Sequence, residues 1–308
     1  MMARAPGDFD SYWQATLDAL AAYPAAAQVE PIPLRTTAFA TMYGVHLTSI
    51  GPYRIFAYLS IPTGRGPFPA IYYAPRYQSV MQPAPQGTAS LQRSRYITLA
   101  LAARGYRNAD KPYAAPFPGL LTEGIDSGGS YIFRGIAADC VRGLDFLLTR
   151  PELDPRRVVV VGNDMALITA ALHPGATHAV ATPELFHDTL ARAAKTAAYP
   201  LEEINDYLRL YPERREAVGR TLSYFDLRAF APRVRAATLI MAGAKGSALD
   251  ARALSPVTDG LEGAVTVRES ERSSYKDGLF AESWIAAQCG IGDVRSILPE
   301  AWAKAASP

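Results

Sequence analysis

Apolar residues recur at helical spacing near the start of the chain. The spacing of three or four residues holds for Phe9, Trp13, Leu17 and Leu20. Asp8, a residue type common at helix N-caps, stands just before them, so the pattern predicts an amphipathic helix over residues 8–22. The apolar face of such a helix must pack on the rest of the fold, so we expect a docking helix.

The next segments have the period of strands. Residues 53–61 alternate between apolar and polar positions, and an extended stretch over residues 43–49 precedes them. The N-terminal third is therefore predicted to be antiparallel sheet.

From Phe68 onward, short apolar strands alternate with longer helical patterns. Predicted strands cover residues 70–74, 106–109, 158–161, 179–182, 238–241 and 265–267, and predicted helices cover residues 91–103, 131–148, 165–172 and 279–288. Strict alternation of this kind predicts an α/β fold with a doubly wound, mainly parallel sheet.

One Tyr-rich, helix-patterned stretch interrupts the alternation at about residues 183–235. Ligands of open α/β sheets bind beyond the carboxyl ends of the strands, so a helical cap inserted here is expected to cover the binding site. Since no convincing linker divides the chain, we predict a single domain over residues 1–308, with the cap as an insertion.

The composition indicates a folded protein and argues against some classes of partner. The chain has 308 residues, of which 49% are hydrophobic and 19% charged, enough apolar material for a large core. Thirty-one Lys and Arg against 29 Asp and Glu leave a net charge of +2, which argues against nucleic acid or an anionic membrane as a partner.

The cysteines and the N-terminus bear on metal binding and location. Cys140 and Cys289 are the two cysteines, and their separation indicates neither a disulfide framework nor a zinc site. Met1 to Trp13 contains no apolar core of a secretory signal, and no stretch reaches 18 uninterrupted apolar residues. We therefore expect a cytoplasmic protein without a metal or other cofactor.

The segment from Val158 to Leu172 reads as strand, tight turn and helix, the order of a nucleophile elbow. The usual elbow sequence is GxSxG, whereas this chain has Gly162-Asn-Asp164-Met-Ala166, with Asp164 in place of serine. An ordinary helix N-cap is the alternative, because Asp and Asn cap many βα units.

Several stretches together resemble the acetyl xylan esterase and cephalosporin-C deacetylase family. The stretches are residues 8–13, 131–147, 151–157, 200–207 and 221–226. The resemblance implies the α/β-hydrolase fold, a small acylated or sugar-like ligand, and assembly into a homo-oligomer.

The resemblance also implies a Ser-His-Asp triad, and this sequence departs from each member. Asp164 replaces the serine, Gly246 stands where the acid is expected, and Ser274 and Tyr275 stand where the histidine is expected. Asp250 lies four residues after Gly246. The four histidines are His46, His173, His178 and His187, none of them beyond the cap.

The oxyanion hole is the other part of the family's chemistry. The resemblance places its two backbone N–H donors at Tyr77 and Met165. Pro75 and Arg76, which replace a His-Gly pair before Tyr77, disfavour the hole because proline has no N–H and arginine adds bulk and charge.

Three functions remain open at this point. The first is a degenerate hydrolase that binds a ligand or assembles with partners, with little or no activity. The second is a hydrolase that uses Asp164 as a nucleophile, with His187 or Lys245 activating water. The third is a purely structural subunit.

Three structural expectations follow for Asp164. Its backbone should be strained, as at a sharp elbow. No histidine except His187 should reach its carboxylate. Backbone N–H groups of its own helix and one cation, Lys245 first and Arg76 second, should hold the charge.

Overall fold

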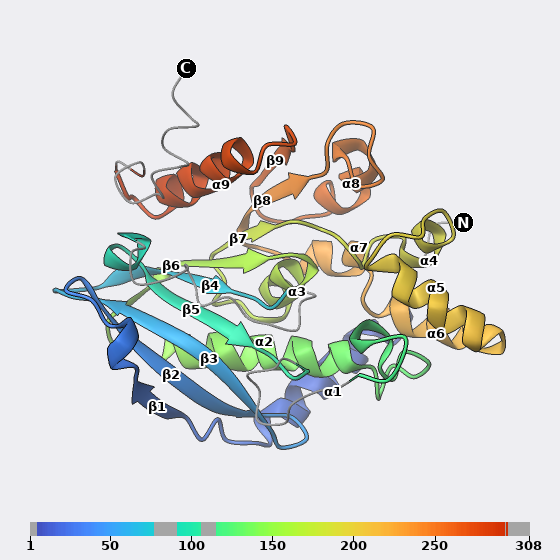
Figure 1. Cartoon of the computed structure of the whole chain (residues 1–308), viewed down its shortest axis with the longest axis horizontal. Helices are drawn as coiled ribbons and strands as arrows, with labels where there is room; N and C mark the ends of the chain where they lie inside the picture. The colour runs from blue at the N-terminus through green and yellow to red at the C-terminus, as the bar shows by residue number, and fades with distance from the viewer. Residues whose placement is uncertain (1–4, 77–90, 106–114, 293, 295–308) are drawn as a thin grey trace.

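A computed structural model describes residues 5–76, 91–105, 115–292 and 294 of the chain. Figure 1 shows a single mixed sheet with helices packed on both faces. The strands are β1 (Gln28–Pro31), β2 (Ala40–Ser49), β3 (Tyr53–Pro62), β4 (Phe68–Tyr73), β5 (Ile97–Ala102), β6 (Leu153–Gly162), β7 (His178–Ala181), β8 (Ala237–Ala242) and β9 (Val265–Glu269).

The helices follow the strands along the chain. The α-helices are α1 (Phe9–Ala21), α2 (Ile132–Leu148), α3 (Asp164–Leu172), α4 (Thr189–Ala193), α5 (Leu201–Leu210), α6 (Arg215–Ser223), α7 (Leu227–Phe230), α8 (Ala251–Thr258) and α9 (Ser274–Gln288). Short 3₁₀ turns are η1 (Pro33–Arg35), η2 (Leu91–Ser94), η3 (Leu120–Thr122), η4 (Pro212–Arg214) and η5 (Ala231–Arg233).

The strand order is β1-β2-β3-β5-β4-β6-β7-β8-β9. The pairs from β1 through β3 to β5 are antiparallel, and all pairs from β5 through β4 to β9 are parallel. The predicted doubly wound, mainly parallel sheet with an antiparallel N-terminal portion is thus confirmed.

One predicted element has the wrong type. Residues 91–103 were expected to form a helix, but they form η2 followed by strand β5. All six residues of β5 are buried, because neighbouring strands flank it and the sheet is covered on both sides. A strand of this kind is apolar throughout and lacks the alternation that identifies a half-exposed strand. The strand predicted at residues 106–109 lies outside the described residues.

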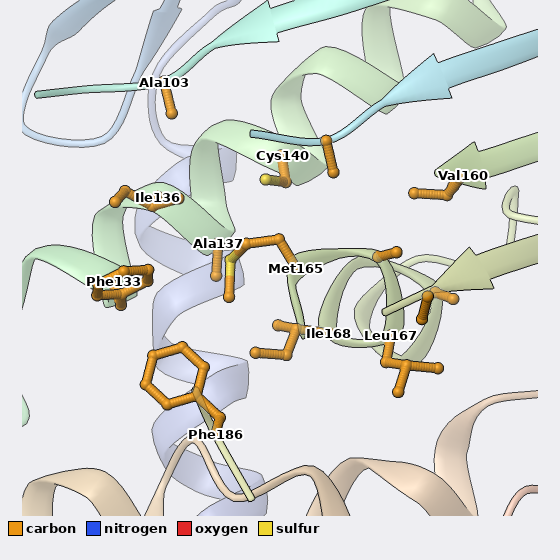
Figure 2. Close-up of a cluster of buried hydrophobic side chains, with 14 of the residues drawn as sticks. Ala103, Phe133, Ile136, Ala137, Cys140, Val160, Met165, Leu167, Ile168 and Phe186 are labelled. Atoms are coloured by element: carbon orange, nitrogen blue, oxygen red, sulfur yellow. The ribbon is translucent and has the colours of Figure 1, made fainter. Parts of the chain in front are cut away.

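The main core lies between the sheet and the layer formed by α1, α2 and α3 (Figure 2). Met165, Leu167 and Ile168 of α3 belong to this core together with α2 residues such as Ile136 and Cys140. A smaller core on the opposite face packs sheet residues against α9. These two layers hold the carboxyl end of β6 in place from both sides.

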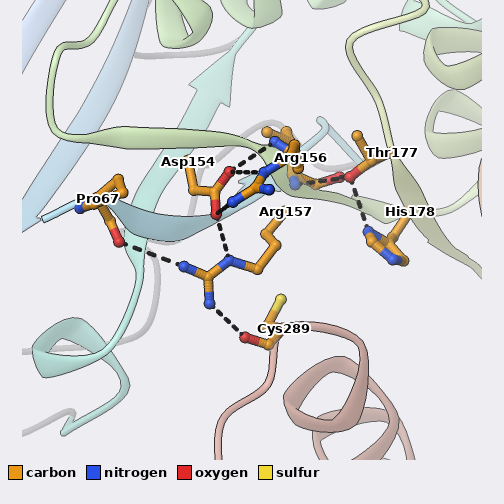
Figure 3. A network of polar contacts seen from close by, with 8 residues as sticks. Pro67, Asp154, Arg156, Arg157, Thr177, His178 and Cys289 are labelled. Atoms are coloured by element: carbon orange, nitrogen blue, oxygen red, sulfur yellow. Dashed lines mark hydrogen bonds and ion pairs between the residues drawn. The ribbon is translucent and has the colours of Figure 1, made fainter.

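Near the amino end of β6, the Asp154 carboxylate holds two arginine side chains of the same strand (Figure 3). It accepts hydrogen bonds from the side chains of Arg156 and Arg157, at 3.2 and 2.8 Å. Arg157 also donates to the carbonyl oxygen of Cys289, just after α9, at 2.8 Å. The hydrogen bond from Arg156 is the main reason that the pKa of Asp154 is lowered to about 2.

The helix predicted over residues 8–22 is α1, and it packs on the segment that leads from α6 to α7. Trp13 is 3% exposed, and its ring meets Phe225 and Phe230 edge-on at centroid distances of 5.3 Å. Its indole N–H donates to the carbonyl oxygen of Tyr224 at 3.1 Å. The apolar face predicted from the sequence pattern is therefore buried where α1 packs on the rest of the fold.

Helices α4 to α7, with η4 and η5, occupy the connection between β7 and β8, within the stretch predicted as a cap. Figure 1 shows them gathered beyond the carboxyl end of β7. Among the described residues, no helix combines the length and the apolar character needed to cross a membrane.

Candidate functional site

The segments that hold the predicted site residues meet at one edge of the sheet. Gly162 pairs with Ala181 across β6 and β7, and Ala242 pairs with Glu269 across β8 and β9. Because β6 to β9 run parallel, the turns after these strands all leave from their carboxyl ends. Asp164, the loop that contains Gly246, and the start of α9 are therefore arranged along a common edge.

The Asp164 carboxylate is buried and accepts hydrogen bonds from three backbone donors. Asp164 is 0% exposed and is the first residue of α3. Its Oδ2 accepts N–H groups from Glu184 and Leu185 at 3.1 and 3.0 Å. Its Oδ1 accepts the N–H of Phe186 at 2.9 Å. The prediction that its own helix supplies these N–H groups is therefore wrong, since they come from the segment after β7.

This arrangement fastens the segment after β7 to the elbow. Successive backbone N–H groups that converge on one anion form a nest, and hydrogen bonds to a charged acceptor are stronger than neutral ones. The N-terminus of α3 adds a favourable dipole for the negative charge. Asp164 therefore acts as an anchor for residues 184–186.

The left-handed backbone conformation that would strain a residue is absent at Asp164. Among the described non-glycine residues, positive φ occurs at Ala26, Asp188 and Arg272, and not at Asp164. The elbow of this chain therefore differs from the expected one in having no positive φ at Asp164. Gly162 still allows a close approach, because a Cβ atom there would lie 3.2 Å from the Cβ of Ala74.

The histidine rings have other neighbours, as the sequence predicts. His173 bonds to Asp145, His178 to Thr177, and His46 packs beside Phe56. His187 is buried, and its Nε2 donates to the carbonyl oxygen of Ala253 at 2.9 Å. Burial lowers the pKa of His187, which favours the neutral ring. The alternative in which His187 swings onto Asp164 does not occur.

The loop after β8 satisfies its own polar groups. Gly246 has φ +81° and donates its N–H to the Asp250 carboxylate at 2.8 Å. Asp250 also caps α8 by accepting the N–H of Ala253 at 2.9 Å. These backbone hydrogen bonds lower the pKa of Asp250. Lys245 is exposed, whereas Asp164 is buried, and no ion pair joins them among the described residues, so the predicted role of Lys245 as the cation is wrong.

The region expected to carry the histidine begins α9. Ser274 is its first residue and Tyr275 is 44% exposed, while the Ser273 hydroxyl caps the helix. Asp277 closes the turn by accepting the hydroxyl of Ser270 at 2.6 Å and the N–H of Glu271 at 3.1 Å. The turn is a self-contained polar network at the surface.

The oxyanion-hole candidates have different outcomes. Tyr77 lies outside the described residues. The side chain of Met165 is 0% exposed and belongs to the core, and its backbone amide follows Asp164 in the first turn of α3. Its role as a donor stays a prediction. Arg76 is exposed, and its positive charge acts on the carboxyl group of Glu184.

Two polar residues at the elbow escape the sequence reasoning, Asn163 and Glu184. Asn163 is 3% exposed and lies beside Glu184. Burial raises the pKa of Glu184, and the negative charge of Asp164 raises it further. Asn163 directly follows β6, and Glu184 lies three residues after the end of β7. A polar residue just after a parallel strand is the signal that could have identified both.

A third carboxyl group joins the cap to the body of the fold. Glu203 of α5 accepts the N–H of Leu121 in η3 at 2.5 Å. Burial raises the pKa of Glu203 to about 7, although the backbone N–H groups of Leu121 and Thr122 oppose the rise. Gly119 lies against the carboxyl group, where a Cβ atom would come within 2.6 Å of Cδ.

The described residues offer no cluster of three or more His, Cys, Asp or Glu side chains suited to a metal ion.

Known acetyl xylan esterases share the fold of this chain and match most of its length. Residues 2–249 match the family model of Acetyl xylan esterase (AXE1). The solved acetyl xylan esterase from Paenibacillus sp. R4 superposes with a TM-score of 0.80 and 26% identity, over 92% of this chain and 95% of that one. Acetyl xylan esterase 1 from Thermoanaerobacterium sp. JW/SL YS485 gives a TM-score of 0.79 and 22% identity, over 93% and 95%.

A curated relative is longer than this chain. The acetyl esterase Axe7A of Xylanibacter ruminicola is 26% identical over 243 residues, which are 74% of this chain and 54% of that protein. The chain thus spans about half the length of this relative.

Proposed function

Since this chain belongs to the acetyl xylan esterase family, we propose that it is a degenerate member, a pseudoenzyme with little or no esterase activity. In this proposal the α/β-hydrolase scaffold is kept to bind a small acylated or sugar-like ligand, or to assemble with other chains.

The state of Asp164 carries the proposal. A nucleophile needs a free lone pair and access to the substrate. The Asp164 carboxylate is 0% exposed and accepts three backbone N–H groups from residues 184–186. These features favour a structural anchor over attack on an ester.

The other two triad positions supply no acid or base. Gly246 has no side chain, and Ser274 carries a hydroxyl at the start of α9. A serine or carboxylate nucleophile without a neighbouring imidazole lacks the general base that contributes roughly 10²–10⁴-fold to such reactions. This loss supports very weak or absent turnover.

The alternative is a hydrolase in which Asp164 forms an ester intermediate. That mechanism needs a base to activate water for the second step. His187 donates Nε2–H to Ala253 and Lys245 is exposed, so neither candidate base lies against Asp164. These positions favour the first function over the alternative.

Ester hydrolysis tests the proposal directly. The purified chain is assayed with p-nitrophenyl acetate and with acetylated xylo-oligosaccharides, beside the Asp164→Asn variant. We expect no difference between the two proteins and no labelling by a serine-directed fluorophosphonate. Turnover at about 1–10³ s⁻¹ that disappears in Asp164→Asn would instead establish Asp164 as a nucleophile.

Assembly into a homo-oligomer is part of the same proposal. Light scattering coupled to size-exclusion chromatography measures the mass in solution. A mass that is a multiple of one chain supports assembly, whereas a monomer at micromolar concentration removes this part and leaves ligand binding.

A further inference from the structure

Strand β9 forms one outer edge of the sheet, beyond β8. It is the last strand in the order, and Figure 1 shows it between α8 and α9. Within the described ranges, no strand pairs with its outer side. An edge strand presents a row of backbone N–H and C=O groups to which another strand can add. The residues of β9 therefore decide whether this edge stays open.

The backbone groups of β9 alternate in direction. Thr238 of β8 donates its N–H to the carbonyl oxygen of Ala264 at 2.7 Å, so the even-numbered residues of β9 are the ones that bond to β8. The N–H and C=O groups of Val265, Val267 and Glu269 therefore point away from the sheet.

Strand β9 lacks most features that protect a sheet edge. Edge strands usually carry lysine, proline, a bulge or a charge aimed along the edge. The sequence Val-Thr-Val-Arg-Glu contains no lysine or proline, and its pairing with β8 has no register shift. Arg268 lies over the Phe280 ring of α9 at 4.9 Å, and Glu269 accepts an N–H group of α8 at 3.3 Å. Both charges are thus held against the flanking helices, while Val265 and Val267 are 37% and 41% exposed.

We propose that β9 pairs antiparallel with β9 of a second copy of this chain, around a two-fold axis at Val267. In this register Val267 faces its own counterpart and Val265 faces Glu269. Every outward backbone group of the strand then finds a partner, and the two sheets join into one. The inference rests on the assembly part of the proposed function, and it names the surface that carries the assembly.

The charges of the strand favour this register and this partner. Thr266 would face Arg268, whereas an axis one or two residues further on would place Arg268 opposite Arg268 or Glu269 opposite Glu269. Like charges that face each other destabilise a strand pair. Outside the strand, Glu262 precedes it and Arg272 follows it, and both are exposed. An antiparallel partner brings these opposite charges to the same end of the pair, so the strand is complementary to itself.

Light scattering coupled to size-exclusion chromatography tests the pairing in the Val267→Lys variant. Two lysines would face each other across the axis, so the dissociation constant of the dimer should rise about tenfold or more. Val29→Lys is the matched control, because Val29 is 39% exposed on β1, at the opposite edge of the sheet. Its mass in solution should equal that of the wild type.

Mixing two variants tests the register. Val267→Lys and Val267→Glu should each be monomeric at a concentration at which the wild type is a dimer. An equimolar mixture should recover dimers, because lysine then faces glutamate across the axis. Recovery in the mixture also establishes that both variants are folded.

Three results would overturn the inference. They are a monomeric wild type, a mass unchanged by Val267→Lys, and dissociation caused by Val29→Lys but not by Val267→Lys. A monomeric wild type whose Val267 amide resists hydrogen exchange would assign the edge to residues 295–308 of the same chain. An oligomer that persists in Val267→Lys would keep the proposed assembly and exclude β9 as its surface. Esterase turnover would contradict the proposed function without changing the outcome of this test.

Discussion

A carboxylate in place of the elbow serine changes which parts of the protein the elbow holds together. Serine would present one hydroxyl, whereas Asp164 accepts three backbone N–H groups from residues 184–186. The Phe186 ring packs edge-on against Phe133 of α2 at 5.0 Å, so the anchored segment also belongs to the core. The single side chain of Asp164 thus connects the end of β6 to the start of the cap, which packs in turn on α2.

Asp164→Asn should therefore lower stability without changing esterase activity. The amide side chain turns one acceptor oxygen into a donor that faces backbone N–H groups. Loss of charge-assisted hydrogen bonds in a buried site costs about 2–4 kcal/mol. The free energy of unfolding, measured in urea, checks this value.

Asp18→Asn is the matched control for that measurement. Asp18 is exposed on α1 and accepts a hydrogen bond from Gln14. Its replacement should change the free energy of unfolding by less than about 0.5 kcal/mol. Equal, small effects at positions 164 and 18 would contradict the anchor.

Glu203 gives the stability a dependence on pH. Its pKa is about 7 in the folded chain, against an ordinary value of 4.5, so between these pH values the folded state binds a proton that the unfolded state does not. The contribution of this group to stability is thus full below pH 4.5 and is lost as pH rises to about 7. Relative to the wild type, Glu203→Gln should gain stability between pH 5 and pH 7.5.

Glu202→Gln provides the comparison, because Glu202 is the adjacent residue and its pKa is lowered by hydrogen bonds from Asn205 and Arg209. Because the pKa of Glu202 is lowered rather than raised, its variant should not gain stability relative to the wild type as the pH rises from 5 to 7.5. Parallel pH profiles for both variants would refute the assignment to Glu203.

Part of the residue-scale picture could be predicted from the sequence. The position of Asp164 at an elbow and the separation of the histidines from it follow from the strand and helix patterns. The donors that bond to Asp164 could not be predicted, because they are backbone N–H groups of residues 184–186, which every residue type except proline carries. For the same reason the sequence favours Lys245 as the partner of Asp164, since a sequence shows charged residues but not the positions of backbone N–H groups.

At the scale of elements, hydrophobic periodicity predicts a helix or strand with one exposed face better than a strand that is buried on both faces. Helix α1 and strand β3 each have one apolar face, and both were predicted close to their observed bounds. Strand β5 is buried on both faces and was predicted as a helix. Its sequence Ile-Thr-Leu-Ala-Leu-Ala contains good helix formers, and tertiary pairing with β3 and β4 overrides that preference.

The docking of α1 leads to a prediction at this scale. Trp13→Ala removes a buried ring that packs against Phe225 and Phe230, and such substitutions cost about 3–5 kcal/mol. Because Phe225 also lies 5.3 Å from Phe186, hydrogen exchange of the Phe186 amide should accelerate. Urea unfolding and amide exchange measure the two effects.

Trp13→Phe is the matched variant, since it keeps an aromatic ring and loses the indole N–H donated to Tyr224. It should lose only about 1 kcal/mol. A Trp13→Ala variant as stable as Trp13→Phe would show that α1 contributes little to the fold.

At the scale of the whole molecule, the sheet keeps the geometry of the α/β-hydrolase fold while the residues at the three predicted triad positions differ from serine, aspartate and histidine. Strands β6, β8 and β9 still deliver their following loops to one edge, in the order that a nucleophile, an acid and a base require. In each of the three loops, an aspartate carboxylate instead accepts hydrogen bonds from nearby backbone N–H groups. Asp164 accepts from residues 184–186, Asp250 accepts from Gly246 and from the first turn of α8, and Asp277 accepts from the turn before α9. The departure from the family's expected triad is thus local to three turns.

Restoring the serine alone should therefore not restore catalysis. An Asp164→Ser hydroxyl without an imidazole keeps its proton near neutral pH and cannot attack an ester efficiently. Recovery requires Asp164→Ser together with Ser274→His or Tyr275→His and with Gly246→Asp. An aspartate is tolerated better than most residues at the φ of +81° found at position 246. Release of p-nitrophenol from p-nitrophenyl acetate, followed in the single, double and triple variants, measures the recovery. Turnover in Asp164→Ser alone would mean that another group of this chain already serves as the base.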